Sequence, residues 1–194
     1  MMPALPAGPA RRDDPSPRDR GASLVEALIA MTIVITTITG VGQLLVWSRR
    51  AVWSSGAGSM SIVLATQKLE QLRALAWHVD AGGHAVSDDT TNLSTDPPSI
   101  GGSGLRASPV GALHESTTGF VDYLDAQGLW RGTGAQAPAG AAFVRRWAIV
   151  PFGPDPLHTV VLHVVVLPVV DAAAGDKRSP RAAHLTTIRT RSVP

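Results

Sequence analysis

The chain has 194 residues, of which 44% are hydrophobic and 16% charged, and its net charge is +2. This length accommodates one domain together with a membrane anchor. The few charges of either sign form no basic patch, so no nucleic-acid partner is predicted. Cysteine is absent. That excludes disulfides and thiolate metal sites, and an exported domain must then be held together by packing and hydrogen bonds.

Residues 1–20 are rich in Pro, Arg and Asp and lack any apolar period. Such a composition predicts a disordered segment. Arginines flank the apolar run that follows, four before it and two after it: Arg11, Arg12, Arg18, Arg20, Arg49 and Arg50. Lys and Arg are enriched on the cytoplasmic side of membrane-spanning helices, and more of these arginines precede the run than follow it. We therefore expect the N-terminus in the cytoplasm and the C-terminal domain in the periplasm.

The run from Leu24 to Trp47 has Glu26 as its only ionisable side chain. About 20 apolar residues suffice for a helix to cross a bilayer, so residues 22–47 are predicted to span the membrane. A charge at the bilayer centre costs roughly 2.5 to 3.5 kcal/mol, and less near the interface. Glu26 is therefore expected to have a partner. The alternative is an ordinary signal anchor in which Glu26 lies near the membrane surface and reaches water.

A basic segment, Gly21, the small residue Ala22, Ser23, two aliphatic residues and Glu26 follow one another here. This pattern resembles the N-terminus of type IV pilins and pseudopilins. The resemblance implies that prepilin peptidase removes residues 1–21 by cutting after Gly21, that Ala22 becomes an N-methylated terminus, and that Glu26 directs assembly. The family usually has Phe where this chain has Ala22.

The sequence stays compatible with a helix over 48–77, with an apolar stripe at helical spacing formed by Met60, Val63, Leu64, Leu72 and Leu75. The stretch 67–73 is similar to PilV-type minor pilins and to pseudopilin I of type II secretion. Gly40 and Gly42 lower helix propensity by about 1 kcal/mol each relative to Ala, so we expect the helix to flex there.

Residues 78–118 contain several Gly and Pro clusters and are predicted to be an irregular connecting loop, a candidate for subunit contacts. Asp88, Asp89 and Asp96 offer oxygens to calcium, but no regular loop of alternating acids is present. Solvated loop acids are the favoured interpretation.

Residues 119–194 favour strands at Gly119–Leu124, Ala142–Val150, His158–Leu167 and Ala183–Arg191, with a turn at 125–128. The connections are rich in turn residues, which predicts hairpins and an antiparallel sheet of about three to four strands. Packed on the amphipathic half of the helix, this sheet gives an α+β fold, as the pilin resemblance also implies.

The six histidines are scattered and show no paired metal-ligand spacing. The segment 101–105 misses the nucleophile elbow, because Leu105 stands where the second glycine belongs. The sequence predicts no catalytic residue, no metal site and no cofactor.

These observations lead to the hypothesis of a non-enzymatic structural subunit. It would be a minor pilin or pseudopilin of the inner membrane, assembled in a priming or tip complex of a type IV pilus or a type II secretion pseudopilus. Its expected partners are prepilin peptidase, other major and minor pilin-like subunits and the inner-membrane assembly platform. The competing hypothesis is a single-pass, signal-anchored binding protein of the periplasm or surface.

Overall fold

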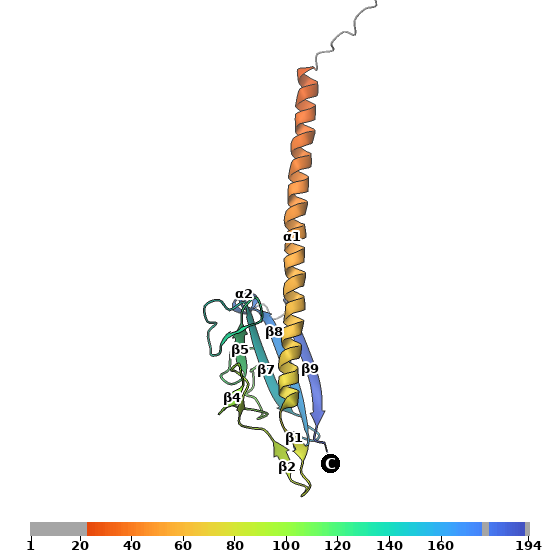
Figure 1. Cartoon of the computed structure of the whole chain (residues 1–194). Coiled ribbons are helices and arrows are strands. Elements are labelled where there is room, and N and C mark those ends of the chain that lie inside the picture. The colour runs from red at the N-terminus through yellow and green to blue at the C-terminus, as the bar shows by residue number, and fades with distance from the viewer. Residues whose placement is uncertain (1–22, 176–178, 193–194) are drawn as a thin grey trace, which may run out of the picture. The chain divides into compact units, whose positions relative to one another are not determined.

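The computed structural model describes residues 23–175 and 179–192. The chain divides into two compact units, Met1–Trp47 and Ser48–Pro194. Helix α1 (Leu24–Ala74) contributes to both, and the sheet belongs to the second unit (Figure 1). The helix ends at Ala74, three residues before the predicted end at 77, because Trp77 begins a strand.

Five strands form the main sheet, with bounds Val121–Leu124 (β5), Trp130–Gly132 (β6), Phe143–Pro151 (β7), Thr159–Pro168 (β8) and Ala183–Thr190 (β9). Their order is β6-β5-β7-β8-β9, and every neighbouring pair is antiparallel. The α+β class is confirmed. The sheet has one strand more than the upper predicted number, because the three-residue β6 carries no alternating pattern that a sequence could reveal.

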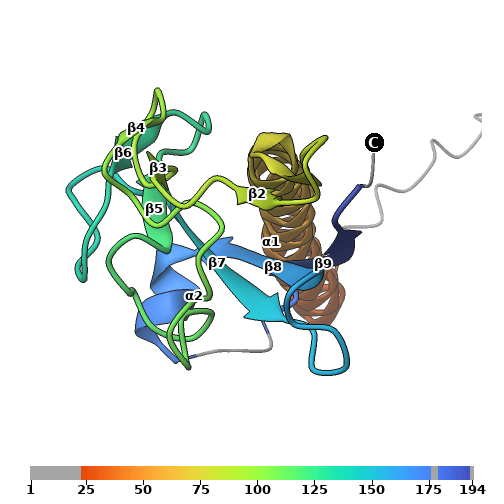
Figure 2. The ribbon, with the colours of Figure 1, turned by 90° about the horizontal axis from the view of Figure 1, so that it is seen from below.

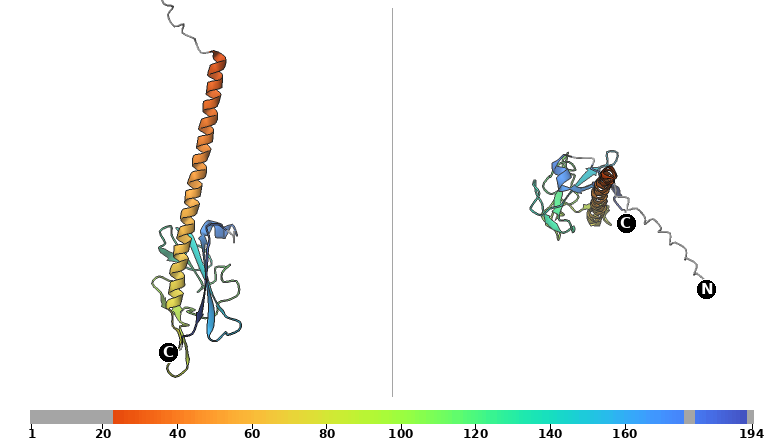
Figure 3. Two further views of the ribbon diagram at one scale, coloured as in Figure 1. Left: turned by 90° about the vertical axis from the view of Figure 1, so that its right-hand side faces the viewer. Right: turned by 90° about the horizontal axis from the view of Figure 1, so that it is seen from above.

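The second half of α1 packs on one face of this sheet. Leu64 and Leu72 of the helix join Trp147, Leu162 and Val164 in the main core, and all five are at most 2% exposed. The sheet lies between the second half of α1 on one side and loops with α2 on the other (Figures 2 and 3). Strand β8 is apolar at nearly every position because both of its faces are covered.

A second apolar cluster covers the opposite face and consists of Val121, Tyr123, Val144, Val165 and Leu167. It packs against residues of the short helix α2 (Val169–Ala173), which the sequence did not predict. Pro168 precedes this helix and closes β8, as expected for a residue that lacks a backbone donor.

The apolar stripe on the helix is only partly as predicted. Met60, Leu64 and Leu72 face the core, but Val63 is 60% exposed, while Lys68 is buried.

The predicted turn at 125–128 is confirmed, since the Gly128 amide donates to the Asp125 carbonyl at 3.0 Å. Gly128 has a φ of +83°, and a Cβ there would lie 2.7 Å from the Met60 methyl, so glycine allows this turn to contact the helix.

The connection 78–118 is more ordered than predicted. Strand β1 (Trp77–Val79) pairs with β2 (Ala85–Ser87), and β3 (Thr91–Asn92) pairs with β4 (Ser99–Ile100). These hairpins have only two or three residues per strand, too few for a period-two pattern to be recognised.

Candidate assembly helix and its anchor

Glu26 lies in the first turn of α1, on an exposed stretch of helix. A carboxylate in this position is favoured by the positive end of the helix dipole. Every side chain from Leu24 to Trp47 is exposed, and this part of the helix is long and apolar enough to cross a membrane. The proposed cleavage site, Gly21 and Ala22, lies outside the described residues.

The threonines of this stretch do not make its surface polar. The hydroxyls of Thr32, Thr37 and Thr39 each donate to the carbonyl four residues earlier, at 2.7 to 2.8 Å. Thr36 does the same toward Thr32 at 2.9 Å. Because these donors are satisfied inside the helix, the surface suits contact with lipid or with another apolar helix.

Gly40 and Gly42 lie inside the continuous helix, and a Cβ at either position would meet no atom within 4 Å. Neither glycine is therefore required by a close contact in this structure. Flexing of the helix at these two positions stays a prediction.

Three buried charges join the helix to the sheet. Lys68 of α1 places its ammonium 2.8 Å from Asp122 of β5, and Arg145 of β7 donates Nε and Nη2 to the two oxygens of the same carboxylate at 2.9 and 2.8 Å. Lys68 and Asp122 are each 1% exposed and Arg145 is 3% exposed. We call these residues the buried triad.

Further contacts fix the triad to the helix backbone and to the core. Arg145 Nη1 donates to the carbonyl of Leu64 at 3.2 Å, and Lys68 donates to the carbonyl of Leu93 at 2.6 Å. The Lys68 ammonium also lies 4.4 Å from the centre of the Trp147 ring. The triad therefore specifies how the helix is rotated and shifted along the sheet.

One carboxylate faces two cations, so the triad holds a net positive charge in the core. Burial lowers the pKa of Lys68 from its ordinary value of 10.5 to about 8. The Asp122 charge opposes this shift, and the Arg145 charge adds to it.

A pH dependence of stability follows from this shift. Between pH 8 and 10.5 the unfolded chain binds the Lys68 proton more strongly than the folded chain does, so the free energy of unfolding rises with pH across that window. Lys68→Met removes this contribution. We expect the stability of the parent chain relative to Lys68→Met to increase from pH 8 to pH 10.5 in urea titrations of the full chain in detergent. A constant or falling difference would contradict a desolvated, protonated Lys68.

A further cation, Arg189, contacts the end of α1. Arg189 of β9 donates to the carbonyls of Leu72 at 3.2 Å and Leu75 at 2.7 Å. The last carbonyls of a helix lack partners within it, and a cation there also suits the dipole. The sequence pattern missed this contact, because the two partners are 117 and 114 residues apart.

Two of the three loop acids considered for calcium, Asp88 and Asp89, have other partners. Asp88 accepts hydrogen bonds from the amides of Thr90 and Thr91, and these bonds and the Thr91 hydroxyl lower its pKa against the opposing effect of burial. Asp89 lies 3.4 Å from Arg106. In the described part of the chain, no three His, Asp or Glu side chains come together as metal ligands.

Comparison with protein-family models, with curated proteins and with solved structures returns no match for this chain.

Proposed function

We propose that this chain is a pilin-like structural subunit, processed by prepilin peptidase and assembled with other such subunits into a type IV pilus or a type II secretion pseudopilus. The observation that carries the proposal is the helix α1. One end of it is an apolar stretch with a single acid in its first turn, and the other end is fixed to a sheet by buried charges. A filament subunit needs both features, because the apolar end packs in the filament core and the other end carries the globular domain.

Cleavage after Gly21 would give Glu26 its partner. The new amino group at Ala22 has an ordinary pKa of about 8 and is positive at neutral pH. In a bundle of parallel helices, Glu26 of one subunit can neutralise that ammonium on its neighbour, which replaces two costly isolated charges by one pair. The pair would set the stagger between subunits.

The absence of cysteine favours a minor pilin or pseudopilin over a major pilin with a C-terminal disulfide loop. By the arginine distribution, the precursor would be an inner-membrane protein with its domain in the periplasm. After assembly the subunit would lie in an extracellular pilus or a periplasmic pseudopilus, in a priming or tip complex.

The N-terminus of the mature chain tests the proposal. The full chain is co-expressed with an active prepilin peptidase or with an inactive variant of it, and intact mass and N-terminal peptides are measured. We expect a chain that begins at Ala22, with or without one added methyl group, only with the active enzyme. An uncut chain, or a cut beyond Trp47, would refute the proposal and favour an anchored binding protein.

A further inference from the structure

Arg146 lies on the face of the sheet that is turned away from α1. It is paired in register with Val121 on β5 and Val165 on β8, and Val165 is paired with His184 on β9. Val121 is fully buried and Val165 is 7% exposed. The guanidinium group is thus placed over an apolar cluster, an environment that disfavours charge without a partner.

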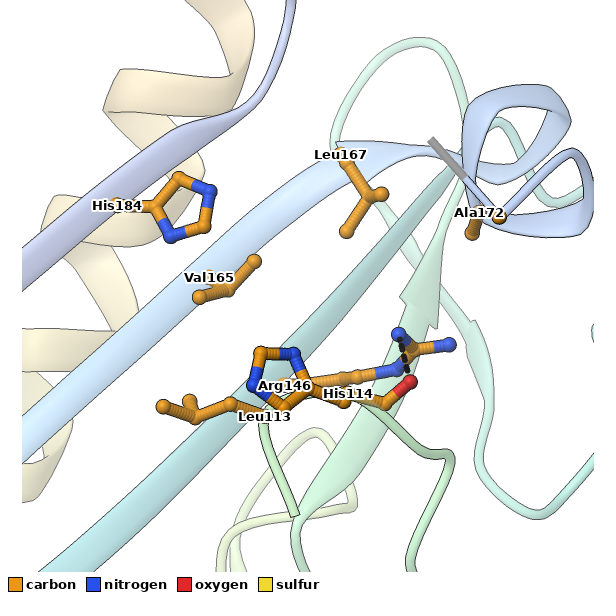
Figure 4. A pocket seen from close by; sticks show the side chains of 8 residues that line it. Leu113, His114, Arg146, Val165, Leu167, Ala172 and His184 are labelled. Carbon is orange, nitrogen blue, oxygen red and sulfur yellow. Dashed lines mark hydrogen bonds between the residues drawn. The ribbon is translucent and has the colours of Figure 1, made fainter. Parts of the chain in front are cut away.

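No carboxylate of the described residues forms an ion pair with Arg146. Its Nη1 donates to the carbonyl of His114 at 2.9 Å and its Nη2 to the hydroxyl of Ser116 at 3.2 Å, both of them neutral acceptors (Figure 4 draws the first). Its Nε is buried and has no hydrogen-bond partner. Burial lowers the pKa of Arg146, while the charges of Tyr123 and Glu115 oppose this shift.

The guanidinium groups of other arginines in the domain have different partners. Arg131, Arg145 and Arg181 each face an aspartate. Arg189 donates to the carbonyls at the end of α1. Arg146 is half-buried, donates only to neutral acceptors and keeps a buried Nε without a partner, so an anion at this position would gain charge-assisted hydrogen bonds.

A hollow of about 250 Å³ opens beside this group. Its polar lining comes from Arg146, Ser116 and Tyr123, and its apolar lining includes Val144, Val169 and Ala172. The Ser116 hydroxyl accepts from Arg146 and from the Tyr123 hydroxyl at 3.0 Å, which leaves its own hydrogen free to donate. A smaller hollow of about 70 Å³, bordered by His114 and His184, shares Arg146 (Figure 4).

We propose that this hollow is a binding site for a carboxylate carried on a short apolar stem. The guanidinium of Arg146 and the hydroxyl of Ser116 donate to the carboxylate, and the valine and alanine side chains contact the stem. Two sources have this chemistry, namely a free short-chain acid and a glutamate side chain of another protein. The histidines at the rim of the smaller hollow are not required for either.

Tyr123 is the only tyrosine of the chain, so 3-fluorotyrosine places a single ¹⁹F probe at the site. The labelled full chain in non-ionic detergent is titrated with sodium butyrate, with butanol and sodium chloride as controls, and with a blocked Ala-Glu-Ala peptide. We expect a saturable shift of the resonance with butyrate or the peptide, with a Kd on the order of 1 mM. The tighter of the two ligands identifies the source.

Arg146→Gln is expected to weaken binding at least tenfold and Ser116→Ala severalfold, whereas Arg106→Gln, an exposed arginine, leaves it unchanged. Ser116→Ala retains the guanidinium and so tests the site even if Arg146→Gln does not fold. No saturable shift, an equal shift with butanol, or full binding by Ser116→Ala and every folded Arg146 variant would overturn the proposal.

Discussion

Asp122→Asn is expected to lower the free energy of unfolding by about 3–5 kcal/mol, the cost of removing one partner from a buried ion pair. The substitution leaves Lys68 and Arg145 facing a neutral amide at a site that is 1% exposed. A loss of that size is a large fraction of the stability of an ordinary domain. Urea unfolding of the full chain in detergent, followed by tryptophan fluorescence, measures it.

Two further variants show whether this loss of stability is specific to the triad or would follow the removal of any aspartate charge. Asp89→Asn breaks an exposed ion pair with Arg106 and should change stability by less than about 1 kcal/mol. Adding Lys68→Met to Asp122→Asn removes one of the two unpaired cations and should restore part of the loss. If Asp122→Asn is no more destabilising than Asp89→Asn, the triad does not hold the helix to the sheet.

The large elements of the fold were predictable because their patterns are long. The apolar run after Gly21 is long enough to cross a bilayer as a helix, and the β-branched run of β8 is bounded by turn residues. The short hairpins β1–β2 and β3–β4 have too few residues for a pattern. Helix α2 has only five residues and was missed for the same reason.

The buried triad was not predictable from spacing. By its spacing, Lys68 is predicted to be one of the polar residues of an amphipathic helix. It is only 1% exposed, because Asp122 and Arg145, on strands far along the chain, form the buried triad with it. Val63 shows the reverse, an apolar residue that the stripe placed inward and that is exposed. Partners that are distant in sequence decide which face of the helix is buried, and a single-helix pattern does not contain them.

Among the candidate functional residues, too, one could be selected from the sequence and another could not. Glu26 could be selected from the sequence because it is the only ionisable residue in an apolar run. That Arg146 has no carboxylate partner among the described residues could not be predicted, since this depends on which side chains surround β7 after folding. Its neighbour Arg145 on the same strand is fully paired.

Glu26→Ala tests the assembly mechanism most directly, and its expected effect is near-complete loss of filament incorporation. The variant, the parent chain and Glu70→Ala are compared in cells that express the assembly machine, by the amount found in purified filaments relative to the membrane fraction. Glu70 is a matched control, because it lies on the same helix and is 59% exposed beside Arg73. The carboxylate of Glu26 is expected to be needed only after cleavage, so the variant should still lose its leader.

We expect the parent chain and Glu70→Ala to enter filaments equally, and Glu26→Ala to be cut after Gly21 but to remain in the membrane. Incorporation of Glu26→Ala at the level of the parent chain would contradict the charge pair. Absence of the parent chain itself from filaments would contradict the proposal that it is a filament subunit.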